Sequence, residues 1–312
     1  MTDGAPATVA VNLMFGRAFV DAIRDALPGE VVVASAEPGA AAAEILAVYT
    51  NDEASVRGSI TPAVRWIHAL STGVDGFPFD AVGDCAFTCS RGAGAVPIAE
   101  WAMAMILAQA KRLPDSWVTE PPARWSVADL DSVAGRTLGL VGIGAIGTEL
   151  ARRALAFDMD VVAFRRRALA APLDGVRVVT SLPELLGEAD HVVVAAPATP
   201  ATHHLLDADA FAAMKPGAHL VNIARGSLVD QDALLAALDA GELAAASLDV
   251  VDPEPLPAGH PLYAHPKVRV SAHISWSTPF GMARTLELFV ENVRRYRAGA
   301  PLEGVVDVAA GY

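Results

Sequence analysis

The chain has little of several features that mark particular classes of protein. Its 312 residues include only two cysteines, Cys85 and Cys89. Lys and Arg together number 23 against 36 Asp and Glu, which gives a formal net charge of −13. Nucleic acids and anionic membrane surfaces attract proteins through a positive patch, so this balance argues against both as partners. A small anionic substrate stays compatible with it, because such a ligand needs only a few local cations.

Two further features are missing, a disulfide framework and a long apolar run. Cys85 and Cys89 fall in one predicted strand, which would hold their Cα atoms roughly 13 Å apart, too far for a bridge. We interpret both as small buried hydrophobic residues. The most apolar run, residues 98–110, is interrupted by Glu100 and Gln109 and is too short to cross a membrane. The N-terminal residues carry no basic run of the kind that opens a signal peptide, so we expect a cytoplasmic protein.

What the sequence does have is a regular alternation of short apolar runs and amphipathic stretches. This pattern is typical of parallel sheets covered by helices, and the length suggests about two α/β domains. A first series of predicted strands spans residues 8–14, 30–35, 44–49, 65–70 and 86–89. A second series spans residues 137–141, 160–165, 191–196, 219–224, 246–251 and 268–272. Helices are predicted at 15–27, 96–113 and 279–297, and residues 114–133 are predicted to form a surface connector that packs on a neighbouring subunit.

A glycine-rich turn follows the first strand of the second series. Gly142, Gly144 and Gly147 fit the pattern G-x-G-x-x-G, with an apolar strand before them and a helical run, residues 148–157, after them. In this context the glycines allow a tight turn and a close approach of the backbone to a pyrophosphate. The alternative is a glycine turn without a ligand. We expect a dinucleotide site here.

The end of the next strand bears on which dinucleotide is bound. NAD sites place an acidic residue about 20 positions after the first glycine, where it binds the ribose 2′-hydroxyl. In this chain Arg165, Arg166 and Arg167 occupy that region. Guanidinium groups bind a 2′-phosphate, whereas a carboxylate would repel it. We therefore expect NADP(H) as the preferred cofactor, with NAD(H) possible; a solvated basic turn is the alternative.

Three reactive side chains follow three successive predicted strands. Arg225, Glu254 and His273 each stand at a carboxyl end, the edge where open α/β sheets bind ligands. Arg225 can pair with a substrate carboxylate and polarise its carbonyl group. His273 can deliver a proton to the developing alkoxide, and Glu254 can hold His273 and favour its charged form. Together they suit the reduction of a 2-oxo acid.

On these residues the chain resembles the D-isomer-specific 2-hydroxyacid dehydrogenases, and among them the glyoxylate/hydroxypyruvate reductases. Besides the glycine turn and the three reactive residues, the matches are residues 96–100, 214–217, 222–226 and 248–255, with a weaker match at 70–75. Two positions depart from the family. Val251 stands where an aromatic residue is frequent, and Ala272 stands where proline commonly precedes the histidine.

The resemblance implies two doubly wound parallel-sheet domains and a homodimer. One is a discontinuous, flavodoxin-like substrate domain formed by residues 1–95 plus 281–312, and the other is an NAD(P)-binding Rossmann domain formed by residues 96–280. It implies cofactor contacts at Ala145, Ile146, Arg165, Arg166, Ala196, Pro197, Ile223, Ala224, Arg225, Asp249, His273 and Ser275. Substrate contacts are expected at Ser71, Thr72, Gly73, Arg225, His273 and Trp276. The substrate side chain is expected to meet residues 71–79 and the segment near 14–17. Trp276, bulkier than its usual counterpart, either narrows the pocket or packs at the dimer contact.

The sequence therefore predicts an oxidoreductase that reduces a small 2-oxo acid to a D-2-hydroxy acid with NADPH. Glyoxylate and hydroxypyruvate are the candidate substrates. One alternative is a dinucleotide-sensing interaction protein on the same scaffold, since a fold does not fix a function. Another is an enzyme like formate dehydrogenase, against which Glu254 argues because formate oxidation needs no proton transfer at a carbonyl. The remaining histidines show no metal-ligand spacing, so no metal is predicted.

Overall fold

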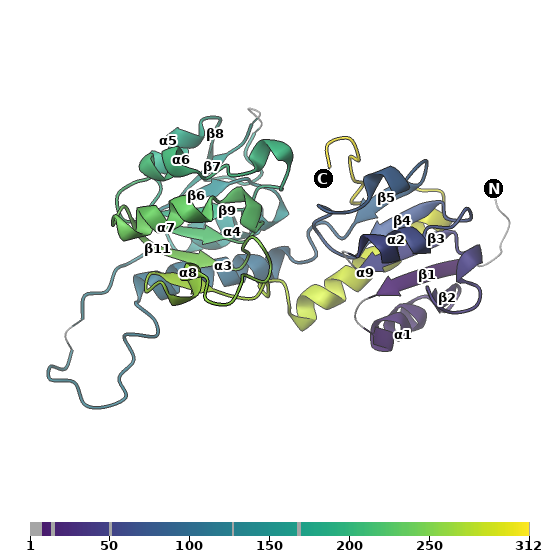
Figure 1. The fold of residues 1–312 in the computed structure, drawn as a ribbon, viewed down its shortest axis with the longest axis horizontal. Helices are drawn as coiled ribbons and strands as arrows, with labels where there is room; N and C mark the ends of the chain where they lie inside the picture. Colours follow the sequence, from purple (N-terminus) through teal and green to yellow (C-terminus); the bar gives the residue numbers. More distant parts are fainter. Residues whose placement is uncertain (1–7, 14–15, 50–51, 127, 167–169, 312) are drawn as a thin grey trace. The chain divides into compact units, whose positions relative to one another are not determined.

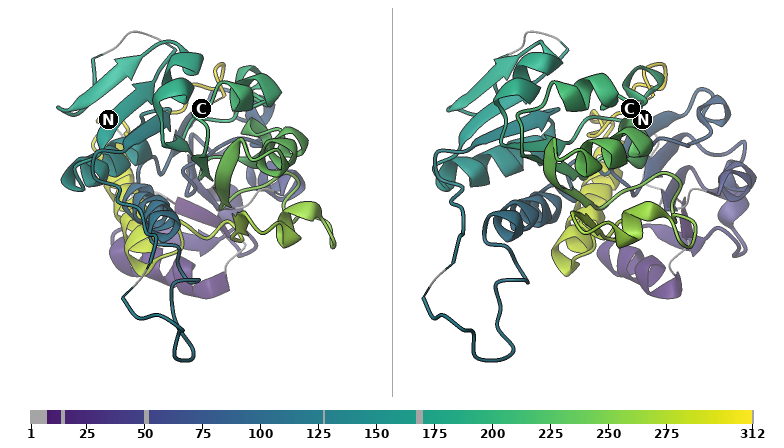
Figure 2. Two further views of the ribbon diagram at one scale, coloured as in Figure 1. Left: turned by 90° about the vertical axis from the view of Figure 1, so that its left-hand side faces the viewer. Right: turned by 60° about the vertical axis from the view of Figure 1, so that its left-hand side comes forward.

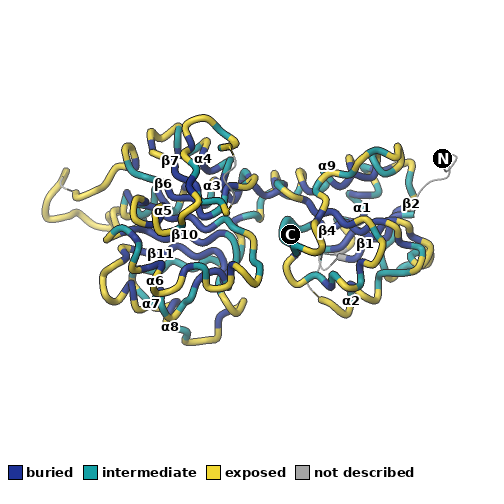
Figure 3. Tube along the Cα trace, turned by 90° about the horizontal axis from the view of Figure 1, so that it is seen from above, coloured by how far each residue is buried: buried dark blue, intermediate teal, exposed yellow. Residues whose placement is uncertain are grey.

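The chain divides into two compact units, which we describe separately. The computed structural model describes residues 8–13, 16–49, 52–126, 128–166 and 170–311. The first unit comprises Met1–Gly94 and Thr278–Tyr312, and the second comprises Ala95–Ser277 (Figure 1). Each unit is built around a parallel sheet with helices, and its buried residues are concentrated in the strands while its exposed residues are concentrated in the loops and helix surfaces (Figure 3).

The sheet of the first unit has the strand order β2-β1-β3-β4-β5 among the described residues, and every pair is parallel. This is the flavodoxin-like order, in which the direction of winding reverses between β1 and β3. The elements are β1 (Thr8–Leu13), α1 (Gly16–Ala26), β2 (Val31–Ala34), β3 (Ile45–Tyr49), α2 (Glu53–Ser59), β4 (Trp66–Ala69), β5 (Ala86–Cys89) and α9 (Pro279–Arg297).

The C-terminal helix α9 completes the core of this unit. Its first turn is capped by Thr278, whose side chain accepts a hydrogen bond from the Gly281 N–H at 3.0 Å, and Pro279 occupies a helix position that needs no N–H partner. Phe289 and Val293 of α9 are fully buried against a cluster that includes Trp66 of β4. The last helix of the chain is therefore part of the same core as the first strands.

The sheet of the second unit has the order β12-β11-β10-β9-β6-β7-β8 among the described residues. It winds outward from β6 in both directions, which is the Rossmann arrangement extended by one strand. The elements are α3 (Ala95–Ala110), β6 (Thr137–Val141), α4 (Ala145–Ala156), β7 (Asp160–Phe164), β8 (Val176–Val179), α5 (Leu182–Glu188), β9 (His191–Val194), α6 (Ala208–Ala212), β10 (Ala218–Asn222), α7 (Gln231–Asp239), β11 (Leu243–Leu248), α8 (Pro261–Ala264) and β12 (Val268–Val270).

A long segment between α3 and β6 carries no helix or strand in its described part. Figures 1 and 2 show the described residues of this segment, 111–126 and 128–136, as a long loop that projects from the rest of the second unit. Two of its aromatic side chains are strongly exposed, Trp117 at 70% and Trp125 at 74%. The irregular segment matches the predicted connector.

The prediction of two doubly wound parallel sheets is confirmed, although several elements end a few residues from their predicted bounds; the helix predicted at 96–113, for example, ends at Ala110. β11 begins and ends three residues before the predicted strand at 246–251, so that Asp249 lies directly after it. β8 is a strand that the sequence analysis does not predict, because a strand of four residues at a sheet edge has only a weak hydrophobic pattern. Cys85 is only half-buried and precedes β5, whereas Cys89 is buried as expected; both thiols are free. Within the described ranges, no helix is long and apolar enough to cross a membrane.

Both sheets bury neutral histidines. The His68 ring is fully buried, with Nδ1 2.7 Å from Thr88 Oγ1 and Nε2 3.1 Å from Ser90 Oγ. Burial lowers the pKa of His68 to about 3. In the second unit His191 Nδ1 lies 3.3 Å from His219 Nδ1, and burial lowers the pKa of His191 to about 4. These rings therefore act as uncharged hydrogen-bonding groups at neutral pH.

We expect the free energy of unfolding to decrease as the pH drops below about 6.5. The unfolded chain then protonates its histidines, whereas folded His68 stays neutral until about pH 3. Each such histidine adds up to about 1.4 kcal/mol of destabilisation per pH unit in that window. Urea unfolding at several pH values measures the slope. His68→Gln should reduce it, and His203→Gln, at an exposed position, should not. Equal slopes for wild type and His68→Gln would contradict this account.

Candidate active site

Three reactive side chains lie at the carboxyl edge of the second unit's sheet. Arg225 follows β10, Glu254 follows β11, and His273 follows β12. β11 lies between β10 and β12, and all three strands run parallel. The loops that leave them therefore start from neighbouring positions on the same edge.

Glu254 and His273 form a hydrogen-bonded pair. His273 Nδ1 lies 2.9 Å from Glu254 Oε2, and the two side chains are 37% and 38% exposed. Because an ionised carboxylate can only accept, Nδ1 carries the proton and Nε2 is the ring nitrogen left to exchange a proton with a substrate. The other carboxylate oxygen accepts the Val251 N–H at 3.2 Å. The pair is thus oriented from both sides and accessible.

The charge of Glu254 is stabilised by its neighbours. Partial burial by itself raises the pKa of Glu254, but the hydrogen bond and charge of His273, the Val251 N–H and the charge of Arg225 outweigh that effect. The net result is a pKa below the ordinary value for glutamate. Glu254 is therefore ionised at neutral pH and accepts the hydrogen bond of the His273 ring.

A buried carboxylate holds the turn that carries His273. Asp249 is only 1% exposed. Its Oδ1 accepts the Ser271 hydroxyl at 2.5 Å and the Ile274 N–H at 2.9 Å, and its Oδ2 accepts the Ser275 N–H at 3.0 Å. The Asp249 carbonyl accepts the His273 N–H at 2.8 Å. One residue at the end of β11 thus fixes the whole segment that leaves β12.

His273 itself adopts a left-handed backbone conformation, with φ of 53°. Such a conformation costs a non-glycine residue on the order of 1 kcal/mol and persists where surrounding contacts determine it. Besides Asp249, the Trp276 indole takes part: its Nε1 donates to the His273 carbonyl at 2.9 Å. The Trp276 ring packs against the apolar cluster that includes Ile98 and Ile106 of α3. Whether it also narrows the substrate pocket or contacts a second subunit stays a prediction.

The turn that carries Arg225 is held in a similar way. The Asn222 side chain donates to the Arg225 carbonyl at 2.8 Å and accepts the Ala224 N–H at 3.0 Å. Gly226 packs directly on the loop of Glu254, since a Cβ at this position would lie 2.0 Å from the Val251 carbonyl carbon. Only glycine fits there. The backbone segments bearing the guanidinium and the carboxylate are therefore in contact.

The predicted glycine turn joins β6 to α4, and each glycine meets a different constraint. Gly142 has φ of 100°, and a Cβ there would approach the Ala195 carbonyl to 2.9 Å. A Cβ on Gly147 would lie 2.8 Å from the Gly142 carbonyl oxygen. At Gly144, by contrast, a Cβ would have no atom within 4 Å apart from those of the adjoining residues, so the space beside this glycine is open. That open space, at the N-terminus of the helix that starts with Ala145 and Ile146, fits a pyrophosphate.

Arg165 lies next to this turn. It follows β7 directly, and its guanidinium donates to the Ile143 carbonyl at 2.9 Å and to the Ala170 carbonyl at 3.1 Å. The half-buried group is thus anchored beside the glycines, and Arg166 is exposed after it. Arg167 lies outside the described residues. A cation held at this place fits the 2′-phosphate of NADP(H) better than the 2′-hydroxyl of NAD(H).

The other expected cofactor contacts lie at the same edge of the sheet. Ala196 and Pro197 follow β9, and Ile223 and Ala224 follow β10. The Pro197 carbonyl accepts the Thr202 hydroxyl at 2.8 Å, which fixes the segment after β9. Together with the glycine turn, these segments leave the carboxyl ends of β6, β9 and β10, neighbours in the sheet.

The expected substrate loop belongs to the first unit. Ser71, Thr72 and Gly73 follow β4, and the Ser71 hydroxyl donates to the Gly73 carbonyl at 2.7 Å. The Thr72 hydroxyl donates to the Ser90 carbonyl at 3.2 Å, and the Ser90 N–H donates to the Ser71 carbonyl at 3.1 Å. The loop is therefore tied to the segment after β5, and through the Ser90 hydroxyl to the buried His68 ring.

Some residues that shape the site go beyond the sequence predictions. The close contact of Gly226 and the hydrogen bonds by which Asp249 fixes the His273 turn depend on backbone geometry, which the sequence does not reveal. So does Gln231, whose side-chain oxygen accepts the Asp252 N–H at 3.2 Å and whose amide donates to the Asp252 carbonyl. A polar residue at the end of an apolar strand, as at Asn222, is the one signal that the sequence offers. Within the described part of the chain, no group of three or more His, Cys, Asp or Glu side chains could hold a metal ion.

Comparison with known proteins gives consistent matches. The model of the D-isomer specific 2-hydroxyacid dehydrogenase NAD binding domain matches residues 103–275. Glyoxylate/hydroxypyruvate reductase A of Serratia proteamaculans (strain 568) is 33% identical over 216 residues, which are 68% of this chain and 68% of that protein.

Solved structures agree over nearly the whole chain. A D-isomer specific 2-hydroxyacid dehydrogenase from Xanthobacter autotrophicus Py2, in complex with NADPH and MES, has a TM-score of 0.86 at 29% identity and covers 99% of this chain and 100% of that one. An NADPH-dependent glyoxylate/hydroxypyruvate reductase from Sinorhizobium meliloti, in complex with NADP and sulfate, has a TM-score of 0.84 at 25% identity, with 98% and 100% covered. With the family model and the reductase sequence, these matches show that the chain belongs to the D-isomer specific 2-hydroxyacid dehydrogenase family.

Proposed function

We propose that this protein reduces a small 2-oxo acid to the D-2-hydroxy acid with NADPH. The observation that carries the proposal is the 2.9 Å hydrogen bond between Glu254 and His273. These residues follow β11 and β12, and β11 is the neighbour of β10, which leads into Arg225. A cation, a proton donor and a carboxylate partner are the groups that carbonyl reduction of a 2-oxo acid requires. Glyoxylate and hydroxypyruvate are the substrates we favour, in line with the names of the similar reductases.

The proton comes from His273. Its Nδ1–H is directed at Glu254, so that Nε2 of the charged ring donates to the carbonyl oxygen as that oxygen becomes an alkoxide. Glu254 remains ionised and stabilises the charged ring. Arg225 pairs with the substrate carboxylate through its planar fork and polarises the neighbouring carbonyl. In oxidation of the hydroxy acid, the neutral His273 ring takes the proton back.

The second unit would hold the cofactor. Gly142, Gly144 and Gly147 would receive the pyrophosphate, with Arg165 and Arg166 at the 2′-phosphate. The rest of the cofactor would contact residues of the neighbouring loops, namely Ala196, Pro197, Ile223, Ala224, Asp249, His273 and Ser275. When bound, NADPH supplies the hydride that reduces the carbonyl carbon. In this proposal residues 96–280 form the coenzyme domain, and residues 1–95 with 281–312 form the substrate domain that contributes Ser71, Thr72 and Gly73.

The function is tested by NADPH oxidation with a panel of 2-oxo acids and matched aldehydes. We expect turnover of glyoxylate and hydroxypyruvate and poor turnover of aldehydes that lack the carboxylate. Arg225→Lys keeps a charge but loses the bidentate fork, so it should raise KM and lower kcat for the acids. Binding of NADPH without turnover of any acid would favour a dinucleotide-sensing protein. Oxidation of formate would favour the formate-dehydrogenase alternative.

Cofactor preference depends on the arginines after β7. Arg165→Asp removes one or two charge-assisted hydrogen bonds and repels a 2′-phosphate, so NADPH binding should weaken by roughly 10- to 100-fold while NADH use improves. Titration of cofactor binding by fluorescence, with NADPH and NADH in parallel, measures the change. Arg177→Asp, an exposed arginine elsewhere on the same unit, is the matched control. An unchanged preference in Arg165→Asp and in the Arg165/Arg166 double variant would refute the assignment.

The pH dependence of reduction reports on the Glu254–His273 pair. Reduction needs a charged His273, so kcat/KM should fall as the pH rises and the ring loses its proton, while oxidation should rise over the same range. Glu254→Gln keeps the shape but removes the negative charge that favours the charged ring. The falling limb should then move to lower pH, and a shift of one unit corresponds to about 1.4 kcal/mol of lost stabilisation. Profiles of wild type and Glu254→Gln that superimpose would exclude this role.

We also propose a homodimer held in part by the connector of residues 114–133. Trp117 and Trp125 place two large aromatic surfaces in solvent on this segment, and aromatic side chains are enriched in the buried centres of protein interfaces. Exposed aromatic rings on an extended segment fit a surface that a second copy covers.

We propose a cytoplasmic location as well. The two free thiols are compatible with it.

Removal of the tryptophans should weaken the dimer. Loss of one buried aromatic anchor typically costs about 2 kcal/mol or more, so Trp117→Ala and Trp125→Ala should each raise the dissociation constant at least about 30-fold. Sedimentation velocity over a range of protein concentrations measures it. Tyr263→Ala, an exposed aromatic residue outside the connector, serves as the control. A wild-type monomer, or a dimer insensitive to both changes, would rule the interface out.

A further inference from the structure

A line of buried polar side chains runs from the core of the first unit to its proposed substrate loop. Trp66 and His68 are two residues apart on β4 and share one face of it, and Thr88 of the neighbouring β5 and Ser90 directly after it meet them there. Trp66 Nε1 donates to Thr88 Oγ1 at 2.8 Å, and Thr88 Oγ1 lies 2.7 Å from His68 Nδ1. His68 Nε2 lies 3.1 Å from Ser90 Oγ. All four residues are fully buried.

The His68 ring bridges two hydroxyl groups. A neutral imidazole has one N–H donor and one nitrogen acceptor, whereas a hydroxyl can act in either role. In either tautomer the ring therefore donates to one of the two hydroxyls and accepts from the other. Packing fixes the ring, since the centroid of the Phe289 ring of α9 lies 5.1 Å from its own and that of Trp66 lies 5.9 Å away. The side chain at position 68 thus determines where Ser90 Oγ is held.

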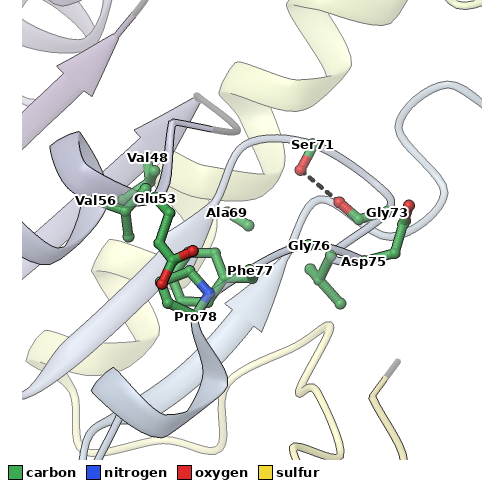
Figure 4. A pocket seen from close by; sticks show the side chains of 11 residues that line it. Val48, Glu53, Val56, Ala69, Ser71, Gly73, Asp75, Gly76, Phe77 and Pro78 are labelled. Carbon is green, nitrogen blue, oxygen red and sulfur yellow. Dashed lines mark hydrogen bonds between the residues drawn. The ribbon is translucent and has the colours of Figure 1, made fainter. Parts of the chain in front are cut away.

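Ser90 passes this restraint to the loop through its backbone. The Ser90 N–H donates to the Ala69 carbonyl at 2.9 Å and to the Ser71 carbonyl at 3.1 Å. The Ser90 carbonyl accepts the Thr72 hydroxyl at 3.2 Å. Figure 4 shows the Ser71 hydroxyl turned toward the Gly73 carbonyl, to which it donates at 2.7 Å. The loop therefore has its hydroxyls tied to the protein, and Ser90 holds its first two residues.

The backbone of the loop is what remains for a ligand. The hydroxyls of Ser71 and Thr72 both donate to carbonyls of the protein. Within the described residues, the N–H groups of Thr72 and Gly73 donate to no acceptor. Backbone N–H groups on a short loop bind a carboxylate well if the loop keeps them in a fixed arrangement. The firmness with which the loop is held therefore bears on binding.

We propose that His68 is a positioning residue for the substrate: its ring holds Ser90, and Ser90 holds the loop whose N–H groups bind the carboxylate of the 2-oxo acid. The inference rests on the proposed function and adds a residue of the core to it. An apolar side chain at position 68 would leave two buried hydroxyls without this partner, and each would turn toward another acceptor. The Ser90 segment would then shift, and the loop would lose the geometry that the carboxylate needs.

The test replaces His68 by leucine, which has a similar volume and forms no side-chain hydrogen bond. The loop then binds the carboxylate less well, so KM for glyoxylate and hydroxypyruvate should rise by roughly 5- to 30-fold. The fall in kcat should stay within about 3-fold, because Arg225 and His273, which act on the carbonyl, belong to the second unit. His68→Gln retains a donor and an acceptor, so its KM should stay within about 3-fold of the wild-type value.

Two further variants separate positioning from a general loss of stability. Ser90→Ala removes the hydroxyl that His68 holds, so it should reproduce the rise in KM. The double variant with His68→Leu should exceed either single one by no more than about 3-fold, because both changes break the same contact. Trp66→Phe weakens the same core but leaves His68 in contact with Ser90, so it should lower the midpoint of urea unfolding without changing KM.

Hydrogen exchange measured by mass spectrometry follows the loop without turnover. The N–H groups of Leu70 and Ser90 are hydrogen-bonded on either side of the loop's attachment. Peptides that contain them should exchange faster in His68→Leu than in wild type or in Trp66→Phe, and His68→Gln should restore the wild-type rate.

The outcomes keep this inference apart from the proposed function. If wild type reduces no 2-oxo acid, the proposed function fails, and hydrogen exchange alone decides whether His68 orders the loop. If wild type reduces these acids and His68→Leu leaves their KM unchanged, the function stands and positioning by His68 is overturned. A rise in KM that His68→Gln does not reverse, or that Trp66→Phe shows equally, would overturn it too.

Discussion

All strands of a parallel sheet run in one direction, so everything the sheet presents at its carboxyl edge must be carried by the segments that leave it. In the second unit, β10, β11 and β12 deliver Arg225, Glu254 and His273 to that edge from adjacent positions. The strand order therefore decides which side chains can meet. Loop contacts only refine the distances, as in the 2.9 Å contact between Glu254 and His273.

The refinement relies on buried polar groups rather than on apolar packing. Asp249 satisfies the backbone of the turn after β12 with a carboxylate that is 1% exposed. A buried carboxylate without such partners would be strongly destabilising, so the fold depends on each of these contacts. Asn222 does the same for the turn after β10. The strain at His273 is thus held by contacts that the rest of the sheet keeps in place.

Much of this architecture could be read from the amino-acid sequence, because it follows from local pattern. β6, β5 and α9 begin and end at the predicted residues, since each is a distinct apolar or amphipathic run with clear boundaries. β11 was harder to place, because Leu243–Leu248 is rich in alanine, which has little preference for strands, while the valines after it suggest one. The three reactive residues were found from their positions after strands. The supporting contacts of Asp249 and Gly226 required coordinates, because they join backbone atoms of segments far apart in the sequence.

The contact between Gly226 and Val251 has a consequence for how this site can change. No side chain separates the two backbones there, because a Cβ would lie 2.0 Å from the Val251 carbonyl carbon. The spacing between the segment of the guanidinium and the segment of the carboxylate therefore equals the contact distance of two main chains, and no amino-acid exchange can tune it. Variation in what the site accepts must come from elsewhere, through the residues that surround the substrate. The reacting groups form a fixed module, and the recognition of the substrate is free to diverge around it.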